Sequence, residues 1–317
     1  MKCTGKGISV FSVLVFGCVL LTGCQSENTV AKYEAENYNN NLYEGHLYAE
    51  DLCVSKDDVE IEDFTGDSSL HAAGLFNIDD KTVDYAYNIH EKIYPASTTK
   101  ILTALTAMEL CDMDETAASS FDIEAQVCGL QEGDQISMEA LLNGLLLHSG
   151  NDNAVAIAEY AGDGSVEDFV NLMNKKAEEL GATNTHFVTP NGLHDENHYT
   201  TAYDMYLIFN ECIKHQEFMD IISSDSYTAD ITGTDGTVRQ VTWYPTSYYA
   251  KGEAALPDGA EVIGGKTGYT GEAGNCLILL DQDESGKHYI SIVMGADSKP
   301  LLYEDMTAII NQIPNLS

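Results

Sequence analysis

Residues 94–105 read Tyr-Pro-Ala-Ser-Thr-Thr-Lys-Ile-Leu-Thr-Ala-Leu, and they begin an amphipathic helical pattern. Pro95 suits a tight entry into a helix, and apolar residues then recur at helical spacing. Ser97 and Lys100 are three positions apart, so they share one face of this predicted helix. A serine hydroxyl needs an adjacent base to act as a nucleophile, and a lysine amine can be that base if its pKa falls well below about 10.4. The pair therefore predicts a nucleophile and its base at a helix start, where free backbone N–H groups can stabilise an oxyanion.

A second interpretation of the same pair is a helix-capping serine followed by a solvated lysine. Ordinary residue usage gives about one Ser-x-x-Lys match by chance in a chain of this length. On these residues alone both interpretations stay open, and other parts of the chain have to separate them.

The charge of the chain excludes some classes of function. Its 51 acidic residues against 15 Lys and Arg give a net charge of −36. A surface that binds nucleic-acid phosphates is incompatible with this balance, and anionic lipid headgroups should also repel it. Solubility explains the acidity simply, and the 44% hydrophobic content is enough for a real core.

The first residues predict a targeting segment. Lys2 and Lys6 precede an apolar run at 8–21, which is too short to span a membrane comfortably. Leu-Thr-Gly-Cys at 21–24 follows and resembles a bacterial lipobox. The resemblance implies that residues 1–23 are a lipoprotein signal peptide, that Cys24 is lipidated, and that the protein is anchored to the bacterial membrane outside the cytoplasm. A plain secretory signal is the alternative.

Residues 24–68 are predicted to be a tether, since they are polar and lack a lasting periodicity, with a weak signal for ordered structure at 54–64. The folded domain is predicted at 69–317. Five cysteines follow Cys24, an odd number without metal-ligand spacing. At most two disulfides are possible, and buried free thiols are at least as plausible.

Periodicity then predicts the order of elements in the domain. A hairpin at 72–78 and 83–89 leads into the Ser97 helix, and the region of about 117–222 is mostly helical. Further helices are expected at 138–146, 165–181, 202–213 and 300–313, and further strands at 227–231, 238–244, 262–267, 276–280 and 289–295. The sequence therefore predicts an α/β fold of the α+β type: an antiparallel sheet built from both ends of the chain, flanked by helices, with an inserted all-helical lobe.

Two further segments carry reactive side chains. His-Ser-Gly-Asn at 148–151 lies between two apolar runs, which could also make it an ordinary helix–helix turn. Gly-Gly-Lys-Thr-Gly-Tyr-Thr-Gly at 264–271 ends a predicted strand, and its glycines would let a ligand backbone lie against that strand. A phosphate-binding loop would need glycine where Ala260 stands.

The set of three motifs, Ser-x-x-Lys at 97–100, Ser-Gly-Asn at 149–151 and Lys-Thr-Gly at 266–268, is much more specific than any one of them. With the lead-in at 94–97 and the segments 181–187, 191–194 and 198–205, the chain resembles the low-molecular-weight penicillin-binding proteins, the serine-type D-alanyl-D-alanine carboxypeptidase family. The resemblance covers about residues 70–297. It implies a β-lactamase/transpeptidase-like fold, with no cofactor and no metal. Many family members also carry a β-rich second domain and a C-terminal anchor, which this sequence does not show.

The resemblance also implies a role for each site residue. Ser97 would attack the carbonyl, Lys100 would take its proton, Ser149 would relay a proton to the leaving amine, and Asn151 would hold Lys100 and the substrate amide. Lys266 and Thr267 would bind the terminal carboxylate, while Gly268 lies beside them and the backbone N–H groups of Ser97 and Tyr269 would form the oxyanion hole. The implied partners are the peptidoglycan pentapeptide as substrate and β-lactams as inhibitors.

Three other functions remain open on the sequence. A class A β-lactamase would need a Glu-x-x-Leu-Asn stretch between the second and third motifs, and none is present. A DD-endopeptidase would use identical residues, and a non-catalytic module that binds the cell wall or β-lactams would keep the fold. Four histidines are predicted to be structural: His148, His186, His194 and His198. Four aromatic residues are predicted to lie in the core or on a sheet face, with the lining of a sugar or peptide groove as the alternative: Trp243, Tyr244, Tyr248 and Tyr249.

Overall fold

The computed structural model describes residues 49–316, apart from 63, 65, 67–69 and 119–126. The compact unit that carries the helices and strands runs from Asp51 to Ser317. The predicted signal peptide at 1–23 and the predicted lipidation site Cys24 lie outside the described residues. Among the described residues, no helix combines the length and the apolar character that crossing a bilayer requires.

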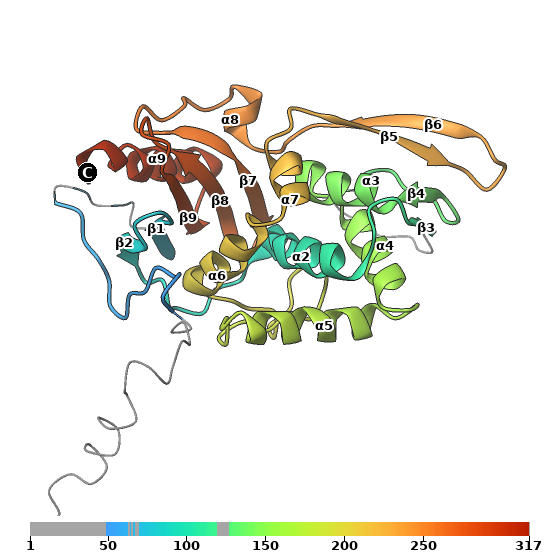
Figure 1. Cartoon of the computed structure of the whole chain (residues 1–317), viewed down its shortest axis with the longest axis horizontal. Coiled ribbons are helices and arrows are strands. Elements are labelled where there is room, and N and C mark those ends of the chain that lie inside the picture. Colours follow the sequence, from blue (N-terminus) through green and yellow to red (C-terminus); the bar gives the residue numbers. More distant parts are fainter. Residues whose placement is uncertain (1–48, 63, 65, 67–69, 119–126, 317) are drawn as a thin grey trace, which may run out of the picture. The chain divides into compact units, whose positions relative to one another are not determined.

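The centre of this unit is an antiparallel sheet of five strands in the order β2-β1-β9-β8-β7 (Figure 1). Two strands come from the start of the domain and three from its end, which confirms the prediction of one sheet built from both ends of the chain. β7 is an edge strand, so one side of its backbone faces away from the sheet. The strands are β1 (Ala72–Asn77), β2 (Thr82–Tyr87), β7 (Glu261–Thr270), β8 (Gly274–Gln282) and β9 (His288–Ala296).

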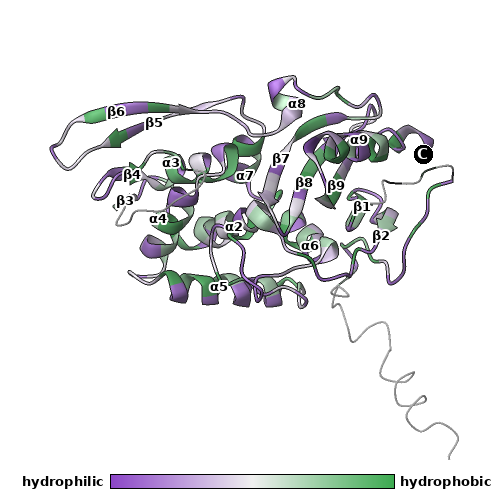
Figure 2. Cartoon of the chain, turned by 180° about the vertical axis from the view of Figure 1, so that it is seen from behind, coloured by the Kyte–Doolittle hydropathy of each residue, from purple (hydrophilic) through white to green (hydrophobic). Residues whose placement is uncertain are grey.

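Helices cover both faces of this sheet, which explains the unbroken apolar run in β8. Leu277 and Leu279 pack with α9 (Lys299–Ile310). Ile278 and Leu280 point the other way, into the larger core that contains the helices around the Ser97 motif. These are the 3₁₀-helix η1 (Ala96–Thr99), α2 (Lys100–Leu110) and α6 (Ala202–Cys212). Figure 2 shows the apolar colouring of the strands between the two helical layers.

The inserted lobe is largely helical, but the prediction that it is all-helical is wrong. It contains α3 (Met138–Asn143), the π-helix η2 (Gly144–His148), α4 (Asn151–Ala161), α5 (Val166–Glu179) and α7 (Gln216–Ile222). A second sheet, in the order β3-β4-β5-β6, adds β3 (Thr116–Ala118), β4 (Gln135–Ser137), β5 (Tyr227–Thr232) and β6 (Val238–Trp243). Strands of three residues are too short to show a period of two, so the sequence pattern missed them.

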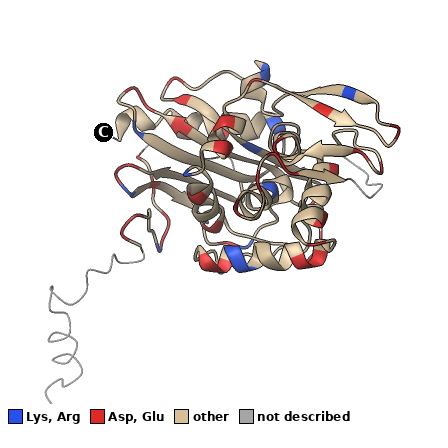
Figure 3. Ribbon diagram, turned by 45° about the vertical axis from the view of Figure 1, so that its right-hand side comes forward, with Lys and Arg blue, Asp and Glu red and all other residues tan. Residues whose placement is uncertain are grey.

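The excess acidic residues lie mainly on exposed turns and on the outer faces of helices such as α5 (Figure 3). The predicted cap of α5 is confirmed, because Oγ of Ser165 accepts the backbone N–H of Asp168 at 3.1 Å. The five cysteines among the described residues are all free thiols, and four of them are buried.

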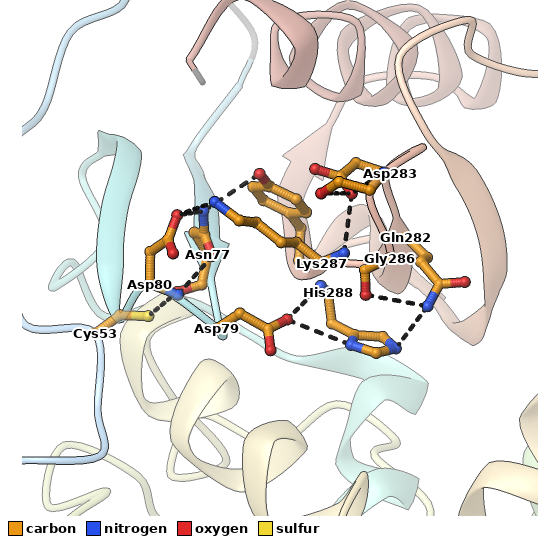
Figure 4. Close-up of polar contacts among 11 residues, drawn as sticks. Cys53, Asn77, Asp79, Asp80, Gln282, Asp283, Gly286, Lys287 and His288 are labelled. Atoms are coloured by element: carbon orange, nitrogen blue, oxygen red, sulfur yellow. Dashed lines mark hydrogen bonds and ion pairs between the residues drawn. The ribbon is translucent and has the colours of Figure 1, made fainter.

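The predicted tether is wrong in its last part, because residues 51–62 pack on the domain. Cys53 is buried, and both of its donors are bonded within the protein. Its N–H donates to the hydroxyl of Tyr206 at 2.8 Å, and its thiol donates to the carbonyl of Asn77 at 3.2 Å. Val59 forms a bridge with Ala86 of β2. Figure 4 shows Cys53 beside the turn after β1, which Asp80 joins to Lys287 at 2.6 Å. The ordered domain therefore begins near residue 51, because the contacts that fix this segment come from residues distant in sequence.

Candidate active site

The nucleophile candidate Ser97 lies in a 3₁₀ turn that leads into α2, rather than in the α-helix itself. Ala96, just before it, has a φ of 48°, which is uncommon for a residue with a side chain. Lys100 is the first residue of α2, and its Nζ lies 2.9 Å from Oγ of Ser97. The predicted nucleophile–base pair is thus within hydrogen-bond reach.

Lys100 is completely buried, and its Nζ makes three polar contacts, the first being the one with Ser97. Its Nζ donates to Oδ1 of Asn151 at 2.8 Å and to the backbone carbonyl of Asn191 at 2.6 Å. A neutral amine has two N–H bonds, so both are used by these acceptors and the lone pair is left for the hydroxyl proton of Ser97. Burial, reinforced by the charge of Lys266, holds the pKa of Lys100 well below its usual value. A buried amine with a lowered pKa, within hydrogen-bond reach of Ser97, is suited to the role of base.

A strained backbone turn positions Ser149 and Asn151 of the second motif. The π-helix η2 ends at Ser149, which has a left-handed φ of 65°, and α4 begins at Asn151. Such a conformation costs about 1–3 kcal/mol for a residue that is not glycine, and it persists only where the surroundings fix it. π-Helical turns and strained residues are common at functional sites. The turn separates the two side chains so that Asn151 reaches Lys100 while Ser149 reaches Lys266.

Lys266 on β7 joins the second and third motifs. Its Nζ donates to Oγ of Ser149 at 2.7 Å and to the carbonyl of Thr267 at 2.8 Å. Only 1% of Lys266 is exposed, and burial lowers its pKa to about 7. An anion beside it would favour the charged form, so the amine is suited to hold a carboxylate.

β7 lies directly against the turn that carries Ser97, and Gly268 permits this approach. A Cβ at this position would lie 3.1 Å from the backbone nitrogen of Ser97 and 3.0 Å from the carbonyl oxygen of Pro95. Tyr269, the next residue, is 62% exposed at the edge of the cleft. A larger residue at 268 would separate β7 from the start of η1, where the two predicted oxyanion donors belong.

These side chains surround one cavity of about 480 Å³. Its lining includes Ser97, Ser149, Asn151, Thr267 and Tyr269. Pockets of about 300–1,000 Å³ are typical of small-ligand sites. The structure thus brings the three motifs together, and among the described residues the cavity lining contains no aspartate or glutamate.

Several residues of the site were not assigned a role from the sequence. Oγ1 of Thr246 lies 2.6 Å from Oγ1 of Thr267 and thereby extends the wall of the cavity. The carbonyl of Asn191 holds Lys100, as described above, and the Asn-Gly pair at 191–192 was a visible turn signal. No local pattern marks Thr246, because its partner is reached only when two distant segments lie side by side.

His198 supports the turn that carries Ser97. Its Nδ1 accepts the N–H of Val188 at 3.1 Å, so the proton of the neutral ring lies on Nε2, which is 2.8 Å from Oγ1 of Thr99. Thr99 in turn donates to the carbonyl of Ala96 at 2.8 Å. Burial lowers the pKa of His198 to about 4, so the ring is neutral at pH 7. The chain of contacts fixes the strained residue beside Ser97.

The aromatic residues of 243–249 divide between two roles. Trp243 and Tyr249 are buried, as predicted, whereas Tyr244 and Tyr248 line the cavity. Among the described residues, no group of three or more His, Cys, Asp or Glu side chains is arranged to hold a metal ion.

Comparisons with known proteins agree with this geometry. Residues 65–298 match the family model described as D-alanyl-D-alanine carboxypeptidase. The chain is 34% identical over 240 residues to D-alanyl-D-alanine carboxypeptidase DacF of Bacillus subtilis, covering 72% of this chain and 57% of that protein. It is 31% identical over 230 residues to a D-alanyl-D-alanine carboxypeptidase of Streptomyces, covering 68% of this chain and 77% of that one. The matched part is thus little more than half of the Bacillus protein.

A solved structure is also similar. The crystal structure of the Streptomyces K15 DD-transpeptidase superposes with a TM-score of 0.71 at 28% identity, covering 80% of this chain and 100% of that chain. The predicted fold, a mixed α/β architecture of the transpeptidase type, is confirmed by this likeness.

Proposed function

This chain belongs to the D-alanyl-D-alanine carboxypeptidase family, and from that premise we propose that it removes the terminal D-alanine from peptidoglycan stem pentapeptides through an acyl-enzyme. One observation carries the proposal. The buried amine of Lys100 lies 2.9 Å from the hydroxyl of Ser97, and Ser97 lines one cavity with Thr267 and with Ser149, the hydrogen-bond partner of Lys266.

In the acylation step, the lone pair of Lys100 takes the hydroxyl proton while Oγ of Ser97 bonds to the carbonyl carbon of the penultimate D-alanine. The backbone N–H groups of Ser97 and Tyr269 stabilise the oxyanion that forms. The C–N bond to the last D-alanine then breaks. The proton passes to the leaving amine through Ser149, which already bonds to Lys266.

Lys266 and Thr267 bind the free carboxylate of the last D-alanine. Lys266 lies where a charge is costly without a partner, so its attraction for a carboxylate is strong. The hydroxyl of Thr267 is held by Thr246 at 2.6 Å and is positioned for the same group. A substrate without a terminal carboxylate should therefore be a poor one.

Water then attacks the ester carbon of the acyl-enzyme, which releases the shortened peptide and returns the proton to Ser97. β-Lactams should acylate the same serine, because they present a strained amide beside a carboxylate. The absence of aspartate and glutamate from the described cavity lining disfavours a class A β-lactamase, whose deacylation requires a glutamate.

The proposed place of action is outside the cytoplasm, where peptidoglycan is. The lipobox-like Leu-Thr-Gly-Cys at 21–24 supports a lipid anchor on Cys24. Metabolic labelling with a palmitate analogue, compared between the full chain and its Cys24→Ala variant, tests this anchor.

The proposed activity is tested with the purified protein and its Ser97→Ala variant. The wild-type protein should release D-alanine from diacetyl-L-lysyl-D-alanyl-D-alanine. After penicillin treatment, mass spectrometry of the protein and of its peptides should find one adduct, on the peptide that contains Ser97. The variant should show neither. An adduct that persists in the variant would refute the assignment of the nucleophile.

A further inference from the structure

The cavity continues beyond the residues that the proposed reaction needs. From Thr267 its wall passes to Thr246 and then to Tyr248 and Lys251, with Lys299 also in the lining. Thr267 is assigned to the carboxylate of the leaving residue and Ser149 to its amine. This extension therefore lies on the side of the cleft that receives the leaving residue.

The charge of this extension is opposite to that of the chain as a whole. Acidic residues outnumber Lys and Arg by 51 to 15, yet the lining contains Lys251 and Lys299 and no acidic residue among the described ones. Neither lysine forms an ion pair with an acid that the structure describes, whereas cations elsewhere, such as Lys214, Arg239 and Lys287, do.

The backbone that carries Lys251 is fixed rather than loose. It ends the short helix α8 (Tyr248–Lys251), which Ser247 caps at its start and Gly252 closes with a φ of 69°. Tyr249 fixes α8 to α9, since its hydroxyl lies 2.7 Å from Oγ1 of Thr307 on α9. Lys251 is therefore presented from a turn that is tied to the main fold.

Lys299 is presented from the first turn of α9, beside the same helix. Its Nζ lies 5.2 Å from the centroid of the Tyr248 ring, within the range of a cation–π contact. The Tyr248 ring stacks on Tyr303 at 5.0 Å with an interplanar angle of 7°. The N–H of Tyr248 also donates to the hydroxyl of Tyr303 at 2.8 Å. One aromatic stack thus connects the two segments that carry the lysines.

The charge of Lys251 also reaches the catalytic motif. Burial is the main cause that lowers the pKa of His148, and Lys251 adds to it against the opposing effect of Asp152. His148 directly precedes Ser149. Lys251 is therefore close enough to the second motif to influence the charge of a residue beside Ser149.

We propose that Lys251 and Lys299 bind a second carboxylate, carried by the side chain of the leaving residue, so that the site accepts leaving groups larger and more acidic than D-alanine. This inference rests on the proposed function and specifies its substrate class. The leaving residue would then be a D-amino acid whose side chain carries a carboxylate. The terminal carboxylate is assigned to Lys266 and Thr267, so the second carboxylate has its own partners.

The test compares three peptides that differ only in the last residue: diacetyl-L-lysyl-D-alanyl-D-alanine and its D-glutamate and D-glutamine counterparts. D-Glutamate and D-glutamine have almost the same shape and differ in one charge. We expect kcat/KM at low ionic strength to favour D-glutamate over D-glutamine by at least about threefold, the size of an exposed ion pair. The ratio should fall with added salt and should approach one in the Lys251→Gln/Lys299→Gln double variant.

Lys56→Gln is the matched control, because it removes an exposed lysine that does not line the cavity and should leave the ratio unchanged. Equal rates for the two peptides in the wild-type protein would overturn the inference. So would an equal loss on all three peptides in the double variant, since it would assign the lysines to the terminal carboxylate.

When turnover is too slow to measure, the preference for the D-glutamate peptide over the D-glutamine peptide can be obtained from binding. Each peptide is then tested for how well it prevents fluorescent penicillin from labelling Ser97. Failure to cleave any peptide would count against the proposed function. Equal competition by the D-glutamate and D-glutamine peptides would count against this inference alone.

Discussion

Nζ of Lys266 lies 2.7 Å from Oγ of Ser149, and this contact joins two segments 117 positions apart in the sequence. It places a second cation close enough to Lys100 to lower the pKa of that amine, after burial as the main cause. The carboxylate-binding candidate and the proposed base are therefore electrostatically coupled, and the coupling can be measured.

Lys266→Met should shift the acid limb of the acylation profile to higher pH. Without the neighbouring charge the pKa of Lys100 rises, so a higher pH is needed to obtain the neutral amine. The measurement is the second-order rate of penicillin acylation from pH 5 to pH 9. Lys92→Met is the control, since Lys92 lies over the Tyr199 ring and outside the cavity. An unchanged limb in Lys266→Met would show that the two amines are not coupled.

Lys100→Arg should reduce the acylation rate by about 10²–10⁴, the usual contribution of a general base. Arginine keeps the positive charge but cannot lose its proton near neutral pH, so it tests basicity rather than charge. Because Lys100 is buried, Lys100→Met serves as a second variant that is closer in shape. Thermal unfolding verifies that each variant folds. A folded Lys100→Met protein that acylates at the wild-type rate would exclude Lys100 as the base.

Gly192→Ala should abolish acylation, whereas Gly236→Ala should not. Both glycines have a φ of 81°, so alanine costs about 1–2 kcal/mol of backbone strain at either position. A Cβ at residue 192 would also lie 1.9 Å from the carbonyl oxygen of Ala96, while at residue 236 nothing lies within 4 Å. Melting temperature and penicillin labelling of the two variants separate the strain from the clash. Full labelling of Gly192→Ala would mean that the turn before Ser97 is not held by this contact.

Acid should destabilise the fold through His198. Its folded pKa of about 4 is below the ordinary value of 6.5, so the unfolded chain binds the extra proton first. Stability is complete above pH 6.5 and is lost as the pH falls toward 4, by up to about 3 kcal/mol. Urea unfolding at pH 7 and pH 4.5 measures this loss. His198→Gln should be less stable at pH 7 but should lose less on acidification. An equal loss in both proteins would assign the acid sensitivity to other groups.

The family resemblance and most element boundaries could be predicted from sequence, because each depends on local pattern. The hairpin before Ser97, α6, β8 and α9 are marked by periods of two or 3.6 residues and by turn residues at their ends. The three motifs could be recognised in the sequence for the same reason, since each is a few consecutive residues long. The family match over residues 65–298 confirms the resemblance.

The sequence predicted β5 and β6 of the second sheet but not β3 and β4, and it gave only a weak signal of order for the segment at 51–62. β3 and β4 are three residues each, and their pairing partners are distant in the chain. The burial of Cys53 depends on Tyr206, 153 positions away. Interactions of this kind leave no local period in the sequence.

The sequence by itself determined which residues could act as nucleophile, base and carboxylate ligand, because their chemistry is fixed by side-chain type. Only the tertiary structure decided that these residues lie in contact with one another. Burial lowers the pKa of Lys100, and the left-handed turn at Ser149 brings that side chain to Lys266. The packing of α8 on α9 places Lys251 and Lys299 in the same cavity. Desolvation and distance set these properties, and both arise only when segments far apart in the chain come into contact.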